Sequence, residues 1–246
     1  MNVSTPGPAI HNDIGNILTA VFLFIVSVPL LLPCSDLVLR AQQGGTIKGT
    51  VELPPASAAF NKVAPQRYGS YASGSESTAR QKEQPPEATN VVVYLEGSGL
   101  DKVQRDDRKA VLDQRDATFI PHVLPIVKGT TVGIVNRDKT YHNVFSLSPT
   151  RKFNIGRRPT GEEVPVTFDK TGTVQVFCDI HSHMSAFILV LSNPEFVQPN
   201  ADGTFTLDNI PPGKYSIRAW HERFSADPQS VTVAPGETTT VHFVLQ

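Results

Sequence analysis

The hydrophobic pattern beyond residue 44 predicts a protein built from short strands. Apolar and polar residues alternate along short runs, and Gly, Pro and Asp separate each run from the next. Successive side chains on a strand point to opposite faces, so this alternation indicates strands with one buried face. Because no long run has a helical period, we predict an all-β fold, either a sandwich or a barrel.

The predicted strands form a dense central series with sparser strands on either side. They cover residues 45–54, 90–97, 118–127, 130–136, 142–147, 163–169, 172–178, 186–192, 203–210, 214–222, 230–234 and 239–246. Residues 56–88 are rich in Ser, Gln, Glu, Gly and Pro, which predicts a long mobile surface loop. The charged run 101–109 is interpreted as a connection. We therefore predict a central domain over 101–193 and a flanking β-module in two parts, 44–100 and 194–246.

The N-terminal segment has the character of a secretory signal. An apolar run covers residues 17–32, Pro29 interrupts it, and Ala41 is a small residue that could mark a cleavage site. The run is short for a membrane span. We therefore expect residues 1–41 to be a signal peptide and the protein to be periplasmic or secreted. An uncleaved N-terminal membrane anchor is the alternative.

The overall charge argues against polyanion binding. The formal net charge is −1 and the sequence pI is about 6.7. A chain of this kind has no global field that attracts nucleic acid or an anionic membrane surface. We therefore expect no nucleic-acid partner.

The scarce sulfur-containing residues gather in one stretch of the chain. The sequence has two Cys and two Met, and Cys178 and Met184 lie six residues apart with His181 and His183 between them. Cys34 lies within or just after the predicted signal segment, so the mature chain would keep Cys178 alone. A disulfide framework is then excluded, and a single thiol beside imidazoles and a thioether suggests a metal site.

Strand alternation places a thiol and a further imidazole inside the fold. Cys178 shares one strand face with Val174 and Val176, and His142 shares a face with Val144 on another strand. Both side chains are therefore expected to point inward. Two strands that end at the same pole of a sandwich could bring His142 and Cys178 together.

The residue types in this set are those that copper prefers. The spacing C-x-x-H-x-x-M puts Cys178, His181 and Met184 on one tight loop, and His142 could supply the fourth ligand. Two His and one Cys with a weak axial Met form a blue-copper centre. A structural zinc site is a rival, but only one thiolate is available and Met is a poor zinc ligand. A catalytic Cys–His pair is another, but it needs an accessible thiolate.

The span from about residue 110 to residue 192, about a third of the chain, resembles the cupredoxins, most closely the short-loop amicyanin and pseudoazurin-like members. The matching stretches are "FIPHVLPIVKGTTVGIVNRDKTYHNVFS" and "VPVTFDKTGTVQVFCDIHSHM", followed by "AFILVLS". The resemblance implies a Greek-key cupredoxin sandwich. It also implies that the copper ligands are His142, Cys178, His181 and Met184, and that Asn143 fastens the ligand loop by hydrogen bonding.

The ligand loop departs from the family at one position. Many members have Pro directly before the second His ligand, where this chain has Ile180. The loop is then less stiff, and His183 becomes a rival to His181 as a ligand. His181 keeps the family spacing to both Cys178 and Met184.

The resemblance extends to the flanking segments. The whole chain resembles exported bacterial proteins labelled methylamine-utilisation-like, a label that does not establish methylamine as a substrate. The stretches "IKGTVELP" and "NADGTFTLDNIPPGKYSIRAWHE" are similar to the carboxypeptidase regulatory-like sandwich. The copper domain would then be an insertion in that module, although residues 90–97 could pair with either sheet.

These features predict an electron carrier with one type 1 copper per chain, and not an enzyme. A redox protein such as a c-type cytochrome or a dehydrogenase is the expected partner. The basic stretch 150–161 is interpreted as a solvated loop, with a docking patch for an acidic partner as the alternative. The competing function is a copper-binding or cell-envelope binding or sensing module without electron transfer.

Overall fold

The described part of the chain consists almost entirely of β-strands. The structure, a computed structural model, describes residues 43–55, 87–100 and 109–246. These residues form sixteen strands and one short 3-10 helix, η1 (Ala88–Asn90), which confirms the all-β prediction. None of the helical structure described is long and apolar enough to cross a membrane. The predicted signal peptide 1–41, nearly all of the predicted loop 56–88 and almost the whole connection 101–109 lie outside the described residues.

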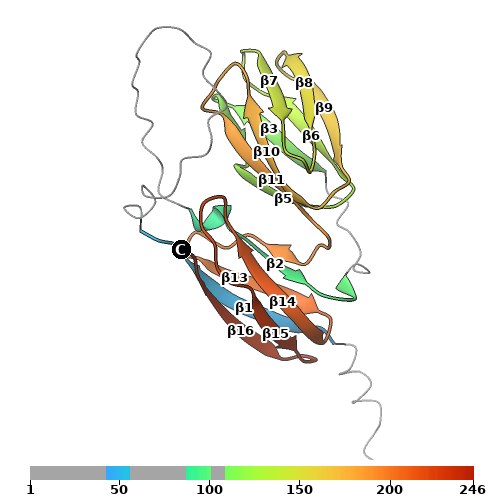
Figure 1. The fold of residues 1–246 in the computed structure, drawn as a ribbon, viewed down its shortest axis with the longest axis vertical. Coiled ribbons are helices and arrows are strands. Elements are labelled where there is room, and N and C mark those ends of the chain that lie inside the picture. The colour runs from blue at the N-terminus through green and yellow to red at the C-terminus, as the bar shows by residue number, and fades with distance from the viewer. Residues whose placement is uncertain (1–42, 56–86, 101–108) are drawn as a thin grey trace, which may run out of the picture. The chain divides into compact units, whose positions relative to one another are not determined.

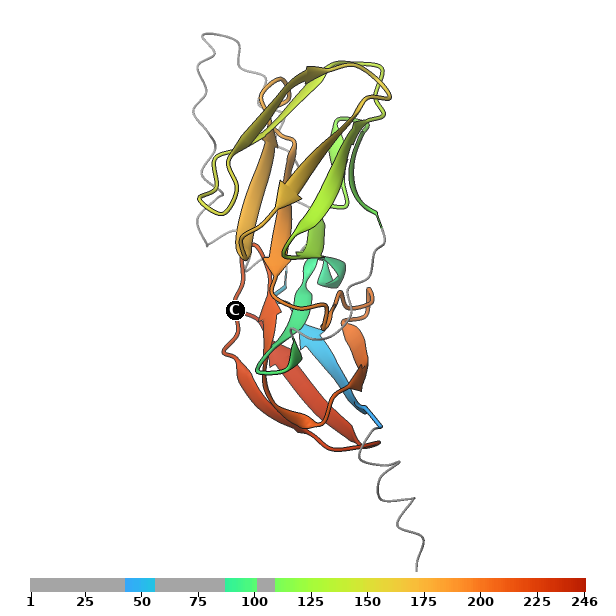
Figure 2. The same ribbon diagram turned by 90° about the vertical axis from the view of Figure 1, so that its right-hand side faces the viewer.

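Two sheets made of strands β3 to β11 pack face to face in a central sandwich (Figure 1). One has the order β5 (Val123–Val127), β11 (Ser185–Leu191), β10 (Gly172–Cys178), β7 (His142–Ser146) and β8 (Phe153–Arg158). The other has the order β4 (Thr118–Ile120), β3 (Ala110–Arg115), β6 (Thr130–Asn136) and β9 (Glu163–Phe168). Buried residues of both sheets, such as Val144 and Phe168, belong to one hydrophobic core. In Figure 2 the orange strands β10 and β11 lie next to each other in one layer of this sandwich.

The remaining strands form two further sheets, which we call the flanking sandwich. One has the order β13 (Thr204–Ile210), β1 (Gly45–Glu52) and β16 (Thr238–Val244). The other has the order β12 (Phe196–Val197), β2 (Val92–Glu96), β14 (Gly213–Trp220) and β15 (Gln229–Val233). Strand β2 therefore pairs within this sandwich, and its Val93 and Leu95 join the same core as Ile47 and Phe243.

Two strands of the central sandwich were not predicted. The stretch 150–161 was interpreted as a solvated loop, which is wrong, because residues 153–158 form β8 at the edge of the five-stranded sheet. Its pattern is weak because Gly156 and two Arg follow Ile155. Strand β3 was missed because its alternation is broken by Gln114, a polar residue that is only 1% exposed.

The pairing of β7 with β10 brings two predicted ligands to one end of the sheet. The strands are antiparallel, with Cys178 opposite Val144 and Phe177 opposite Phe145. The start of β7, at His142, therefore lies beside the end of β10, at Cys178. Val174, Val176 and Cys178 are all buried while Gln175 is exposed, so the predicted inward face of β10 is confirmed.

Candidate metal centre

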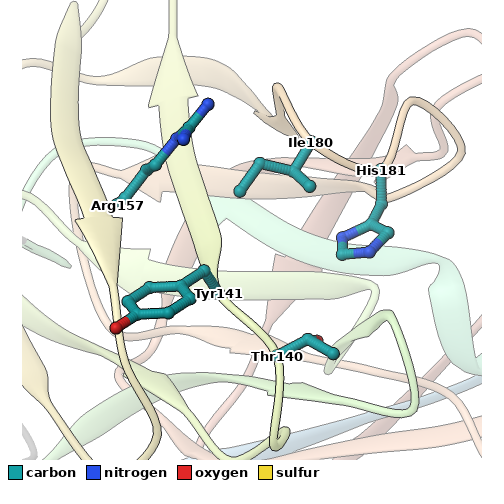
Figure 3. Close-up of a pocket in the computed structure, with 5 residues that line it drawn as sticks. All are labelled: Thr140, Tyr141, Arg157, Ile180 and His181. Atoms are coloured by element: carbon teal, nitrogen blue, oxygen red, sulfur yellow. The ribbon is translucent and has the colours of Figure 1, made fainter.

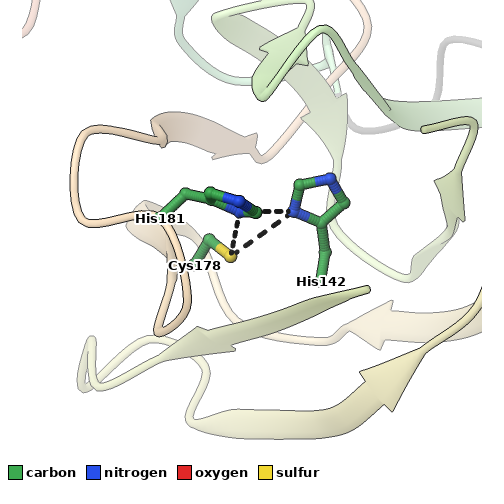
Figure 4. Close-up of side chains that lie close together, drawn as sticks. All are labelled: His142, Cys178 and His181. Carbon is green, nitrogen blue, oxygen red and sulfur yellow. Dashed lines mark hydrogen bonds between the residues drawn. The ribbon is translucent and has the colours of Figure 1, made fainter. Parts of the chain in front are cut away.

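Three potential ligand atoms converge at this end of the central sandwich (Figure 4). The Sγ atom of Cys178 lies 3.6 Å from Nδ1 of His142 and 3.9 Å from Nδ1 of His181. The two Nδ1 atoms are 3.1 Å apart. The three side chains offer one sulfur and two nitrogen atoms within 4.8 Å of one another, which is close enough to share a single ion.

Most of the side chains of this site are buried. His142 is fully buried, and Cys178 is 4% exposed at the end of its strand. Met184, the fourth predicted ligand, is 2% exposed and belongs to the same hydrophobic core as Cys178. The Met184 thioether is therefore shielded from solvent and packs in the same core as the thiol.

Backbone hydrogen bonds close the loop that carries three of the predicted ligands. The amide of Cys178 donates to the carbonyl oxygen of Met184 at 3.3 Å, and the amide of Met184 donates to the carbonyl oxygen of His181 at 3.0 Å. Asn143 ties the loop to β7, because its side-chain amide donates to Asp179 Oδ2 at 2.9 Å and its carbonyl accepts from the Asp179 amide at 3.2 Å. The loop is therefore held at both ends and against a neighbouring strand.

The structure separates the two rival histidines. His181 is half-buried and belongs to the converging group, whereas His183 is exposed and lies outside it. Their ring centroids are 6.1 Å apart. The geometry therefore places His181 with Cys178 and His142, and leaves His183 facing solvent.

A carboxylate that was not predicted lies behind His142. Oδ2 of Asp138 is 2.8 Å from Nε2 of His142, the ring nitrogen that does not face the thiol. The Asp138 carboxyl also accepts from the amides of Asp116 and Ala117, at 2.6 and 2.9 Å. The only sequence signal was an Asp four residues before His142, which is common at surface turns and carried no weight by itself.

Hydrogen bonding and burial set the charges at the site. Desolvation lowers the pKa of His181, and the nearby His142 and His183 lower it further, so the neutral imidazole is favoured. Burial raises the pKa of Asp138, but hydrogen bonds from Ala117, His142 and Asp116 outweigh it and the net pKa is lowered. A neutral imidazole and an ionised carboxylate are the forms in which each can support a bound cation.

A surface pocket of about 500 Å³ adjoins the group (Figure 3). It is lined by Thr140, Tyr141, Arg157, Ile180 and His181. Tyr141 is 60% exposed and Ile180 is 40% exposed, so two large apolar side chains share this pocket with His181. His181 is the one member of the converging group that this surface reaches.

His122, which lies between β4 and β5, does not belong to the converging group. Its Nδ1 lies 3.2 Å from the carbonyl oxygen of Ser185, and its Nε2 lies 3.2 Å from Oε2 of Glu222. Because both ring nitrogens face acceptors, the charged ring is favoured. The hydrogen bond with Glu222 raises the pKa of His122 more than burial lowers it.

Comparison with known proteins gives partial matches. The family model described as a carboxypeptidase regulatory-like domain matches residues 188–246, a range that begins within β11. No curated protein sequence matches the chain. The matched range is about a quarter of the chain and does not assign the whole chain to a family.

Three solved structures illustrate the structural matches. A copper-containing nitrite reductase from Thermus scotoductus matches at 27% identity over 35% of this chain, with a TM-score of 0.33. This chain spans only 23% of that protein. A purple cupredoxin from Nitrosopumilus maritimus matches at 24% identity over 34% of this chain and 100% of its own, with a TM-score of 0.31. A reduced amicyanin mutant matches at 22% identity over 36% of this chain and 87% of its own, with a TM-score of 0.32.

Proposed function

We propose that this chain is a type 1 copper protein that carries electrons and is not an enzyme. His142, Cys178, His181 and Met184 would hold one copper ion. The observation that carries the proposal is the convergence of one thiol sulfur and two imidazole nitrogens within 4.8 Å at the dry end of a β-sandwich.

The donor set fits copper better than other common metals. A thiol, two imidazoles and a nearby thioether form a soft set, whereas calcium and magnesium prefer oxygen ligands. Structural zinc sites are usually built from several thiolates or imidazoles in a closed tetrahedron, and Met184 would add little to one. When bound in such a site, copper supplies a reversible one-electron couple.

The protein's own residues give the site its stability and its dryness. Burial of Cys178 and Met184 keeps water and oxidants from both sulfur atoms. The loop hydrogen bonds and the Asn143–Asp179 pair hold the ligands in one arrangement. A rigid ligand set that does not rearrange between two oxidation states favours fast electron exchange over chemistry on a substrate.

The exposed surface beside His181 is the proposed point of contact with a redox partner. Tyr141 and Ile180 offer apolar contact there, and Arg157 lines the same pocket. Arg151, Lys152 and Arg157 are exposed and form no ion pair with any residue that the structure describes. An acidic redox protein, such as a c-type cytochrome or a dehydrogenase, would be complementary to this surface, and its association would weaken with added salt.

We also propose that the protein works outside the cytoplasm. The apolar run 17–32 and the single Cys that would remain after cleavage near Ala41 support export. N-terminal sequencing of the protein purified from cell-envelope fractions tests this part. A mature chain that begins near residue 42 is expected, and an intact N-terminus on a membrane-bound protein would favour the anchor.

Spectroscopy of the copper-loaded protein tests the function. Adding Cu(II) should give an intense thiolate-to-copper absorption band in the red and the EPR spectrum of a type 1 centre, and Cys178→Ser should give neither. A colourless Cu(II) complex would contradict the proposal. Voltammetry then separates the functions, because a copper-binding or sensing module would bind the ion without a reversible one-electron wave.

A further inference from the structure

The hydrogen bond from His142 to Asp138 defines which ring nitrogen is free. An ionised carboxylate can only accept, so the contact of 2.8 Å between Nε2 and Oδ2 requires the proton on Nε2. In the neutral ring, Nδ1 then keeps its lone pair. That lone pair faces the Cys178 sulfur at 3.6 Å and the His181 nitrogen at 3.1 Å, as Figure 4 shows.

A strained turn holds the carboxylate in place. Asp116 and Ala117 are the two central residues of the β3–β4 hairpin, where Arg115 pairs with Thr118. Both have positive φ angles, 51° and 50°, a conformation that residues other than glycine adopt rarely. Their amides point at the two Asp138 oxygens at 2.6 and 2.9 Å, so the turn presents two donors to one carboxylate.

The backbone around Asp138 is fixed as well. Its own amide donates to the Asn136 side-chain oxygen at 2.9 Å, and the Thr160 hydroxyl donates to its carbonyl oxygen. Asn136 is 1% exposed, and its amide group donates to the carbonyls of Thr140 and Arg158. Asp138 therefore has little freedom to leave His142.

We propose that Asp138 is a positioning residue: anchored by the β3–β4 turn, it fixes the His142 proton on Nε2 and strengthens Nδ1 as a donor to a metal ion. The first part concerns the protein without metal. The second part rests on the proposed copper site. A negative charge that accepts from Nε2 pushes electron density toward Nδ1, which stabilises Cu(II) more than Cu(I). His181 has no such carboxylate among its hydrogen-bond partners within the described chain, so the two imidazoles are not equivalent.

Nitrogen NMR of the metal-free protein tests the first part. In the wild type, His142 should be the Nε2–H tautomer at neutral pH, and Asp138→Asn should shift it toward Nδ1–H or a mixture. Asp113→Asn is the matched control, because Asp113 pairs with Arg137 and Arg115 and has no hydrogen bond or ion pair with a histidine among the described residues. An Nδ1–H tautomer in the wild type, or an unchanged tautomer in folded Asp138→Asn, would overturn the proposal. The wild-type measurement holds even if the variant does not fold.

Metal titration and voltammetry test the second part. Cu(II) affinity should fall about 10–100-fold in Asp138→Asn, the usual effect of removing such a partner. Cu(I) affinity should fall less, so the reduction potential should rise, and Asp113→Asn should leave both unchanged. Equal losses for the two oxidation states would contradict the donor role. A wild type that binds no copper would refute the proposed function while leaving the tautomer result intact.

Discussion

The central and flanking sandwiches are built by the same strand alternation but treat buried polar groups differently. The core of the flanking sandwich is a continuous set of aliphatic and aromatic side chains that includes Ile217 and Phe243. In the central sandwich, three buried polar residues lie where strands begin or end: Asn136 at the end of β6, and His142 and Asn143 at the start of β7, where His142 lies beside Cys178. The comparison shows how a site can be added to a sandwich: the aliphatic core supports the fold, and inward-facing polar residues at strand ends supply the chemistry.

The largest expected effect comes from removing the thiol of the central sandwich. Cys178→Ser should abolish the Cu(II)–thiolate absorption completely. The free energy of unfolding of the metal-free protein should change by only about 1 kcal/mol, because one buried atom is replaced without a large cavity. Absorption spectra and urea unfolding measure the two effects. If the absorption band remained in Cys178→Ser, Cys178 would not be the thiolate ligand.

The opposite pattern is expected in the flanking sandwich. Phe243 is fully buried, so Phe243→Ala should lower the free energy of unfolding by about 3–5 kcal/mol. The spectrum of the copper-loaded folded protein should not change. Val244→Ala is the matched control, because Val244 is the next residue on β16 and is 51% exposed. A change in the copper spectrum of Phe243→Ala would show that the two sandwiches are not independent.

A smaller effect on stability, which depends on pH, is expected from the buried histidine His221. His221 is 5% exposed, and burial lowers its pKa from 6.5 to about 4, with Arg223 and His122 lowering it and Glu222 opposing them. Between these two values the unfolded chain binds a proton that the folded chain does not. Stability should therefore fall as the pH is lowered from about 6.5 toward 4, by at most about 1.4 kcal/mol per pH unit.

His221→Gln should remove this component, since glutamine keeps an acceptor and does not titrate. Urea unfolding at several pH values measures the difference between variant and wild type. His122 works in the other direction, because its raised pKa gives stability that is present below pH 6.5 and lost as the pH rises through the folded value. It contributes equally to both proteins and largely cancels. An identical pH slope in the two proteins would exclude the role of His221.

The smallest effect is expected at the exposed histidine of the ligand loop. His183→Ala should leave copper binding and the absorption band unchanged, whereas His181→Ala should remove the band. Both residues lie on the same loop, so each variant controls for the other. A band that survives His181→Ala and disappears in His183→Ala would show that the loop changes its arrangement when it binds the ion.

Much of the fold and of the site followed from local sequence. Alternation identified most strands and the inward direction of Cys178, because side-chain direction on a strand depends only on position. The spacing of Cys178, His181 and Met184 placed them on one loop for the same local reason. Pattern could not identify β8, in which Gly156 and exposed Arg residues dilute the apolar signal.

The part that sequence could not supply depends on contacts between distant segments. Asp138 lies on the loop after β6, but its role depends on the β3–β4 turn, more than twenty residues away. The positive φ angles of Asp116 and Ala117 are also invisible in a sequence that has no glycine there. The order of strands in each sheet could not be predicted either, because the alternation of apolar and polar residues shows only which face of a strand is buried.

The pairing of β1 with β16 has a consequence for how the chain acquires its structure during synthesis. The two strands pair in parallel from Thr46 to Glu52 of β1, and Thr50 contacts His242 across 192 positions of sequence. All the strands of the central sandwich lie between them. Both neighbours of β1, β13 and β16, also follow the central sandwich in the sequence, so the central sheets can assemble while β1 is still without a paired strand. Contacts this distant in sequence form slowly, so completion of the flanking sandwich is expected to be the late step in maturation.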